Sequence, residues 1–275
     1  MIATRCSVSA LLLLAAGANA ADVAANMIGR QSQNEGLSVV PAPGAVAIDG
    51  DLADWDWSGR NWSFADTAIR DRYSVESAAM WDAKHIYFAA KWRDPTPMGN
   101  MVDATFAPND GWKGDCWQIR VQADRISHLT SWHFTEQARA TMHITHAPGG
   151  GGDPQFVVQA SDGAELGRGI AMAFRKDADG KGYTQEVRVP WSVLYEKPPA
   201  IAAGLTIRIG CEFLWGDPSG KNWPTHRYAD NMQPGVTSRE FYWQNTESWG
   251  NATLLAAGKL TPRRYVAAGS RLPGS

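Results

Sequence analysis

Tryptophans are the first candidate functional residues in this chain, because a flat indole ring can stack on a ligand. Thirteen Trp exceed the eight Phe and the seven Tyr, and an indole buries a large apolar face while it keeps a polar N–H. Trp215 and Trp223 flank a loop rich in Gly, Pro and Asn, which favours a role as walls of a binding platform. Three others, in a polar stretch, suit either core or surface: Trp55, Trp57 and Trp62. Strand-like surroundings predict four in the core: Trp81, Trp92, Trp117 and Trp191.

Carboxylates are the second group of candidate functional residues. Glycoside hydrolysis needs a pair of them, one on each side of the bond that is cleaved. The candidates are scattered along the chain, and no spacing pairs any two of them: Asp82, Asp115, Glu186, Glu212 and Asp217. The sequence also lacks Gly-x-Ser-x-Gly, His-Glu-x-x-His and a phosphate-binding loop. We therefore predict a binding protein rather than an enzyme, and catalysis is the less supported hypothesis.

Length, charge and the first residues restrict the class of protein. The 275 residues carry a net charge of −2, and without a basic stripe nucleic acid is not an expected partner. Arg5, the apolar run 10–16 and the small residues 18–20 are typical of a secretory signal with its cleavage site. We expect residues 1–20 to be a signal peptide and the mature protein to be secreted or periplasmic. No later apolar run approaches the ~20 residues that a membrane span requires.

Alternation of apolar and polar residues with a period of two points to strands. It follows His85, Asp115, Tyr183 and Leu205. Turns rich in Gly, Pro and Asp separate these segments, which is typical of an antiparallel β-sandwich. We predict one all-β domain with only short helices, near residues 192–195 and 136–141.

The expected boundaries place this single domain at residues 41–257. A flexible leader is expected at 21–40 and a flexible tail at 258–275. Within the domain, Cys211 shares the apolar face of its strand, whereas Cys116 lies opposite Trp117. If both apolar faces point to one core, the sulfurs face apart and cannot bridge without backbone movement. We predict two free thiols, with a disulfide as the alternative in an oxidising compartment.

Five short motifs stand in an order that carries a resemblance to a known family. They are Ile48-Asp49-Gly50, Trp81-Asp82 running to Ile86-Tyr87, Asp115-Cys116-Trp117-Gln118-Ile119, Tyr183 to Val189 ahead of Pro190-Trp191, and Trp249-Gly250. This order resembles that of the family 9 carbohydrate-binding modules within the DOMON-like superfamily, over about the whole predicted domain. The resemblance implies a β-sandwich of jelly-roll or DOMON-like type, and an oligo- or polysaccharide as partner.

In sugar-binding members of that family two tryptophans clamp the ligand, and the resemblance places them at Trp112 and Trp243. Trp112 stands three residues before Asp115, and Trp243 stands six before Trp249. Two facing indoles can sandwich a pyranose ring through its C–H groups. We expect such a slot to bind a saccharide chain end.

Polar side chains must then fix the sugar hydroxyls, since stacking alone does not choose among sugars. Gln118 stands where the family has a glutamate, and an amide can donate and accept but lacks the strength of a charged acceptor. Arg120 lies two residues on, on the same face of the predicted strand. With Trp223 as a further wall, these residues complete the predicted carbohydrate site.

The alternative function is electron transfer, because the DOMON-like superfamily also contains b-type haem modules. Residues 92–98 resemble part of those modules, and haem iron needs two axial ligands. Met98 or Met101 would supply one ligand, and the other would come from His133, His143 or His146. The lack of Cys-x-x-Cys-His excludes covalent attachment of the c type.

Family 9 modules also carry structural calcium, so the resemblance implies a metal. The candidates for its ligands are Asp49 and Asp51, in an acidic turn. Ca²⁺ takes about six to eight oxygen ligands, including backbone carbonyls that a sequence does not show. The calcium is therefore expected, and the rest of its ligand set does not follow from the sequence.

Overall fold

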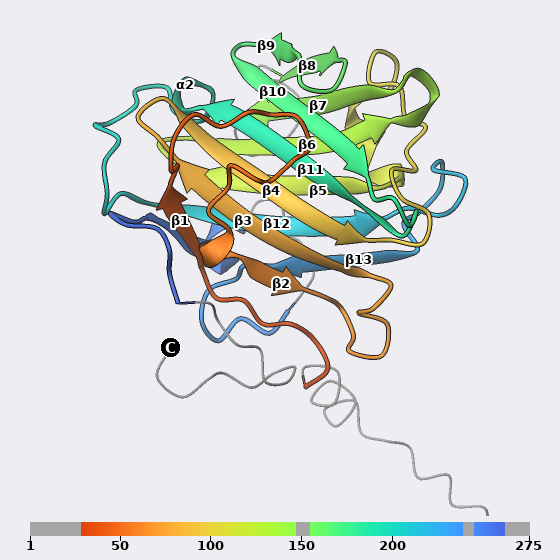
Figure 1. The fold of residues 1–275 in the computed structure, drawn as a ribbon, viewed down its shortest axis with the longest axis horizontal. Coiled ribbons are helices and arrows are strands. Elements are labelled where there is room, and N and C mark those ends of the chain that lie inside the picture. Colours follow the sequence, from red (N-terminus) through yellow and green to blue (C-terminus); the bar gives the residue numbers. More distant parts are fainter. Residues whose placement is uncertain (1–28, 147–154, 239–244, 262–275) are drawn as a thin grey trace, which may run out of the picture.

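The computed structural model describes residues 29–146, 155–238 and 245–261, and strands dominate these ranges (Figure 1). The strands are β1 (Leu37–Pro41), β2 (Asn61–Ser63), β3 (Ser74–Trp81), β4 (His85–Arg93), β5 (Cys116–Gln122), β6 (Ile126–Phe134), β7 (Arg139–His146), β8 (Gln155–Ala160), β9 (Glu165–Gly167), β10 (Ile170–Lys176), β11 (Gly182–Pro190), β12 (Thr206–Trp215), β13 (His226–Asp230) and β14 (Gly250–Leu254). The helical elements in the same ranges are α2 (Trp191–Leu194) and the 3-10 helices η1 (Trp57–Gly59), η2 (Pro108–Lys113), η3 (Thr135–Gln137) and η4 (Thr246–Ser248). No helix in the described ranges is long and apolar enough to cross a bilayer.

Two layers of strands face each other across one apolar core (Figure 1). We name them the β5 sheet (β8-β7-β6-β5-β12-β14, with β13 beside β12) and the β4 sheet (β1-β3-β4-β11-β10-β9, with β2 beside β3). β1 joins them because it pairs in parallel with both β14 and β3. The ring of Phe88 in β4 lies 6.1 Å from that of Trp117 in β5, centroid to centroid. The β-sandwich predicted from the sequence is confirmed.

Alternating burial explains why the four predicted strands form β4, β5, β11 and β12. Every second side chain of these strands points into the core. Burial of apolar surface stabilises the folded state by about 25 cal/mol per Å². The positions of the apolar residues therefore decide which face of each strand turns inward. Of the tryptophans predicted for the core, Trp92, Trp117 and Trp191 are buried in it, and Trp81 packs against it. Trp92 stacks on Tyr183 with the ring centroids 5.2 Å apart.

The structure differs from the sequence analysis at the N-terminal boundary, in three strands beside β5 and in one expected helix. Residues 37–40, expected in the flexible leader, form β1 together with Pro41, and this strand lies between β14 and β3. Val39 and Val40 are both fully buried, and this lack of alternation hides the strand from the sequence pattern. Residues 126–146 and 155–160 add β6, β7 and β8 to the edge of the β5 sheet. The helix expected at 136–141 is only the short turn of η3 before β7.

The two cysteines lie on neighbouring strands and point to opposite faces. Cys211 belongs to the core cluster of the sandwich. Cys116 is buried on the outward face of β5, next in the chain to the inward Trp117. Both thiols are free, as the alternation of the two strands predicts.

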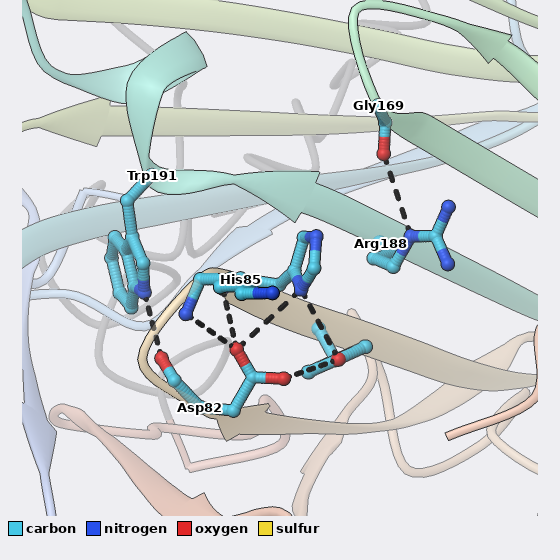
Figure 2. A network of polar contacts seen from close by, with 7 residues as sticks. Asp82, His85, Gly169, Arg188 and Trp191 are labelled. Atoms are coloured by element: carbon cyan, nitrogen blue, oxygen red, sulfur yellow. Dashed lines mark hydrogen bonds and ion pairs between the residues drawn. The ribbon is translucent and has the colours of Figure 1, made fainter. Parts of the chain in front are cut away.

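Asp82 closes the hairpin between β3 and β4, and it explains the motif around it (Figure 2). Its carboxylate accepts hydrogen bonds from the amides of Lys84 (2.6 Å) and His85 (2.7 Å) and from the hydroxyl of Tyr87 (2.7 Å). The carbonyl of Asp82 accepts a hydrogen bond from Trp191 Nε1 at 3.0 Å. The turn and the start of α2 are thereby fixed to each other, which is a structural role for Asp82.

Glu186 fixes the loop that covers part of the outward face of the β4 sheet. Its carboxylate accepts hydrogen bonds from Trp55 Nε1 (2.6 Å) and from the amides of Asp49 (3.0 Å) and Gly50. Trp55 and Ile48 then pack over small apolar side chains of β3, β4 and β10. The motif Ile48-Asp49-Gly50 is therefore the anchor of this cover.

Asp115 ties three loops together at one end of the sandwich. Its carboxylate accepts the amide hydrogens of Gly99 (2.8 Å) and Gly216 (2.6 Å), and its own amide donates to the carbonyl of Gly99 at 2.9 Å. Asn100 donates to the carbonyls of Gly111 (2.7 Å) and Asp115 (3.2 Å). The loops after β4 and β12 and the helix η2 before β5 consequently hold one another in place. We call this set of contacts the Asp115 junction.

A second carboxyl group lies against Asp115. Asp94 directly follows β4, and it is 1% exposed, as against 3% for Asp115. Burial, together with the charge of Asp94, raises the pKa of Asp115 well above its ordinary value, and burial also raises the pKa of Asp94. Two buried carboxylates in contact cannot both ionise, so they share one proton in a hydrogen bond. Asp94 Oδ2 has no hydrogen-bond partner among the described protein atoms, so it is available to such a proton.

Replacement of Trp117 by Ala tests the assignment of the core. The indole is 1% exposed and contacts Phe88 and Phe213, so Trp117→Ala should lose about 3–5 kcal/mol of unfolding free energy. Trp223→Ala removes an exposed indole and should change that free energy by less than about 0.5 kcal/mol. Urea denaturation followed by circular dichroism measures both, and equal losses would contradict the assignment.

The shared proton predicts that the protein loses stability as the pH rises. The native state keeps a proton on Asp115 that the unfolded chain releases above the ordinary value of 3.8. The unfolding free energy therefore falls from that pH upward, until the raised pKa of the folded state is passed. In Asp94→Asn an amide donor replaces the like charge, so the decline in Tm between about pH 4 and pH 8 should be shallower. Asp103→Asn is the control, and an identical slope in all three proteins would refute the shared proton.

Candidate functional site

Gln118 and Arg120 lie on the outward face of β5, as the alternation predicts, because Trp117 and Ile119 point into the core. The register of neighbouring strands surrounds them with further polar side chains. We name the whole group the β5 polar face: Gln118, Arg120, His128, Thr130, His143 and Glu212. Gln118 and Arg120 keep only 7% and 8% of their surface exposed. Their polar groups are thus enclosed although they lie on the outer side of a sheet.

Burial dominates the electrostatics of the β5 polar face. The guanidinium of Arg120 donates a hydrogen bond to Gln118 Oε1. Burial lowers the pKa of Arg120 to about 10, against the attraction of Glu212. Burial also raises the pKa of Glu212 to about 7, and Arg227 and Arg120 offset it only in part. Donors and acceptors held at low dielectric in this way form stronger hydrogen bonds with a ligand than they would in water.

Trp112 lies on η2, at the edge of the β5 polar face. The helix begins at Pro108 and packs against β5, β6 and β7. Gly111 permits this close approach, because a Cβ there would lie 2.5 Å from the ring of Trp132. Asn100 holds the carbonyl of Gly111 at 2.7 Å. The position of Trp112 is therefore fixed by the Asp115 junction and by packing against the sheet.

Trp223 meets Trp112 from the loop that follows β12. The two ring centroids are 4.7 Å apart and the planes make an angle of 48°, while 69% of Trp223 stays exposed. This loop starts at Gly216, whose amide donates to the carboxylate of Asp115. Both indoles are thus supported by the same junction. We call the pair the aromatic corner.

The other tryptophans considered for the site are placed differently. Trp215 is fully buried, and its Nε1 donates to the carbonyl of Arg93 at 2.9 Å, so it belongs to the core and not to a platform. Trp243, the expected partner of Trp112 in the clamp, falls at 239–244, outside the described residues. The structure therefore brings together Trp112 and Trp223 from the predicted aromatic set.

Met98 and the three histidines considered for haem occupy separate environments. Met98 packs against the core from the loop after β4. His133 Nε2 lies 3.6 Å from a carboxylate oxygen of Asp162. On β7, His143 faces outward, and His146 instead contacts the ring of Phe156, which packs on the core. Nothing in the described ranges supports a pair of axial ligands, and haem stays an untested alternative.

The acidic turn expected to hold calcium uses its carboxylates for hydrogen bonds. Asp49 Oδ1 accepts the amide of Asp51 (2.8 Å), Asp51 Oδ1 accepts the amide of Ala53 (3.1 Å), and Asp51 Oδ2 pairs with Arg175 (3.1 Å). Oxygens that bind Ca²⁺ must also face the cation, whereas Asp49 Oδ1 and both carboxylate oxygens of Asp51 face donors of the protein here. Within the part of the chain that is described, no three His, Cys, Asp or Glu side chains cluster to hold a metal. Calcium stays a prediction.

Four of the five carboxylates considered for catalysis have structural partners. Asp82 and Glu186 fix turns, and Asp115 forms the junction of three loops. Asp217 binds Asn222 at 3.0 Å within its own loop, and hydrogen bonds from this and neighbouring groups lower its pKa to about 2. Glu212 is the one that lies on the β5 polar face. The sequence analysis does not include Glu212 in the carbohydrate site. The signal that could have found it is its position between the core residues Cys211 and Phe213 of β12, which turns its side chain outward.

Comparisons with known proteins agree with this architecture. The family described as "Carbohydrate family 9 binding domain-like" matches residues 48–257. No curated protein matches the chain. A family 9 carbohydrate-binding module from Caldicellulosiruptor kristjanssonii, solved with cellotriose, is 16% identical, with a TM-score of 0.50 over 84% of this chain and 100% of that chain. A protein from Bacteroides uniformis described as carbohydrate-binding is 12% identical, with a TM-score of 0.52 over 81% and 100%.

At these identities the solved structures show the likeness of the fold, and the match to the family rests on the sequence. That match starts at Ile48, in the turn that Glu186 anchors, and it ends after β14, the strand that follows Trp249. It therefore covers well over half of the chain and includes η2, the β5 polar face and the loop of Trp223. The chain belongs to the carbohydrate family 9 binding domain-like family.

Proposed function

We propose that this chain is a non-catalytic carbohydrate-binding module whose saccharide site consists of the aromatic corner and the β5 polar face. The observation that carries the proposal is the contact of Trp112 with the largely exposed Trp223, 4.7 Å apart, at the edge of a polar sheet face. Indole rings combine a large apolar face with a polar N–H, which suits the C–H face and the hydroxyls of a sugar. Family membership supports the same function, as does the cellotriose bound to the Caldicellulosiruptor relative.

Aromatic and polar side chains have different roles in the proposed site. Within the aromatic corner, Trp112 contributes contact area against the apolar face of a pyranose ring, and Trp223 supports Trp112. Gln118 can both donate to and accept from a hydroxyl, whereas Arg120 only donates and an ionised Glu212 only accepts. Because Gln118 and Arg120 are nearly enclosed, we place them at the inner end of the slot, with the tryptophans at its mouth.

Trp243 forms the opposite wall of the slot in this proposal, as the family resemblance implies. Trp112 then contacts Trp223 on one side and faces Trp243 across the sugar ring. Two facing walls close the slot around one terminal unit, so the ligand is bound at a chain end. Gln118 in place of the family glutamate makes the recognition of hydroxyls less dependent on charge.

Titration of the purified chain with cellotriose, by isothermal calorimetry, tests the saccharide site. Trp112→Ala and Trp243→Ala should each weaken binding by about 1–3 kcal/mol, the value of burying one large apolar side chain. Trp223→Ala should weaken binding less, because Trp223 supports Trp112 from the side away from the proposed slot. Phe106→Ala removes another exposed aromatic side chain, on the loop before η2, and it is the matched control that should bind like the wild type.

Circular dichroism of each variant separates a lost site from a lost fold. If the wild type binds none of a panel of neutral oligosaccharides that includes cellotriose and glucose, the proposed function is wrong. If folded Trp112→Ala binds as tightly as Phe106→Ala, the site has been assigned to the wrong residues.

A further inference from the structure

An open groove of about 840 Å³ lies on the outward face of the β4 sheet, the layer that does not carry the aromatic corner. Its volume is in the range of small-ligand sites, about 300–1,000 Å³. The floor comes from β3, β4, β11 and β10, whose course is visible in Figure 1. Residues 51–53, from the cover that Glu186 anchors, form one rim, and β2 forms the other. The saccharide site proposed above uses none of these residues.

One row of side chains crosses this floor from strand to strand. The register pairs Trp62 with Glu76, Glu76 with Lys91, Lys91 with Thr184, and Thr184 with Arg175. Paired residues share a face of the sheet, and the chain neighbours of Glu76, Lys91 and Thr184 include core residues, so the row points outward. With strands about 4.8 Å apart, a row over five strands is about 19 Å long.

Contacts along the row hold its charged groups but leave some of their hydrogen-bonding atoms for a ligand. Glu76 Oε2 accepts a hydrogen bond from Arg60 Nε at 2.8 Å, and this contact does not use Glu76 Oε1. At one end the guanidinium of Arg70 lies 5.1 Å from the ring centroid of Trp62. Lys91 Nζ lies 5.6 Å from the ring of Trp57. A cation over an indole is held by the ring, and this contact uses none of its N–H groups. At the far end of the row Arg175 pairs with the carboxylate of Asp51.

The charges that line the groove are balanced in number. Four basic side chains (Arg70, Lys91, Arg93, Arg175) stand with four acidic ones (Asp51, Asp71, Glu76, Asp177). A polyanion needs an excess of positive charge, and a divalent cation needs clustered oxygens without competing cations. A neutral molecule rich in hydroxyls suits mixed charges, because each hydroxyl can donate to a carboxylate and accept from an ammonium or guanidinium group.

We propose that this groove is a second saccharide site, which takes a neutral oligosaccharide along the row from Trp62 to Arg175. Trp62 contacts one sugar ring, and Glu76, Lys91 and Thr184 form hydrogen bonds with hydroxyl groups. The site lies on the other layer of the sandwich, so it does not require the aromatic corner to bind. A polymer long enough to engage both sites at once would bind with higher apparent affinity than either site alone provides.

The experiment removes the first site and measures whether binding persists. Trp112→Ala combined with Trp243→Ala gives the background protein, which is probed on an array of neutral and anionic oligosaccharides that includes cellotriose. We expect this background protein to retain binding to at least one neutral oligosaccharide. The retained ligand is then titrated against the groove variants by calorimetry.

Three substitutions in that background test the row itself. Trp62→Ala, Glu76→Gln and Lys91→Gln should each weaken the retained binding roughly tenfold or more, for the loss of a stacked ring or a charge-assisted hydrogen bond. The Glu76 side chain is 42% exposed and Lys91 is exposed, so these two variants keep the fold even if Trp62→Ala does not. Lys176→Gln, on β10 and outside the groove, is the matched control and should leave binding unchanged.

The outcomes separate this inference from the proposed function. Loss of all neutral ligands in the background protein overturns the second site and leaves the first one standing. The second site is also overturned if neither Glu76→Gln nor Lys91→Gln changes the affinity of the retained ligand. It is likewise overturned if the background protein binds anionic saccharides alone. Binding that depends on the groove residues supports the second site. This holds even if Trp112→Ala alone does not change the affinity of the protein, which would count against the first site.

Discussion

The buried carboxyl of Asp115 is the interaction on which the candidate site depends. It accepts amide hydrogens from two loops and lies three residues after Trp112, so it fixes the position of η2 relative to the loop of Trp223. A buried acceptor is costly to leave without donors, typically by about 1–3 kcal/mol. The proton that it shares with Asp94 removes the further cost of two adjacent buried charges. The junction thus sets where Trp112 and Trp223 meet.

The two layers of the sandwich share one core and have different outer surfaces. On the β5 sheet, polar side chains around Gln118 are enclosed, and the aromatic corner stands at their edge. On the β4 sheet, the cover anchored by Glu186 lies over small apolar side chains, and it leaves the charged row from Glu76 to Arg175 open to solvent in a groove. A sandwich has two outward faces, and a fold of this kind can therefore present two surfaces to ligands.

The alternation in the sequence predicts β4, β5, β11 and β12, because a strand with one buried face has an apolar residue at every second position. It does not predict β1, where Val39 and Val40 are both buried. Motif spacing identifies Trp112, and loop composition identifies Trp223. Their contact could not be predicted, since it depends on the tie from Asp115 to Gly216, 101 residues along the chain. The groove depends on the register of five strands, which no local pattern contains.

A crystal structure of the chain with bound cellotriose tests the central claim most directly, because it locates the ligand without recourse to substitutions. The account predicts a sugar ring against Trp112, with its hydroxyls directed toward the β5 polar face and its apolar face on an indole. Occupancy of the groove on the β4 sheet in the same crystal would be compatible with this account. Cellotriose bound at other surfaces while the aromatic corner of Trp112 and Trp223 stays bare would contradict it.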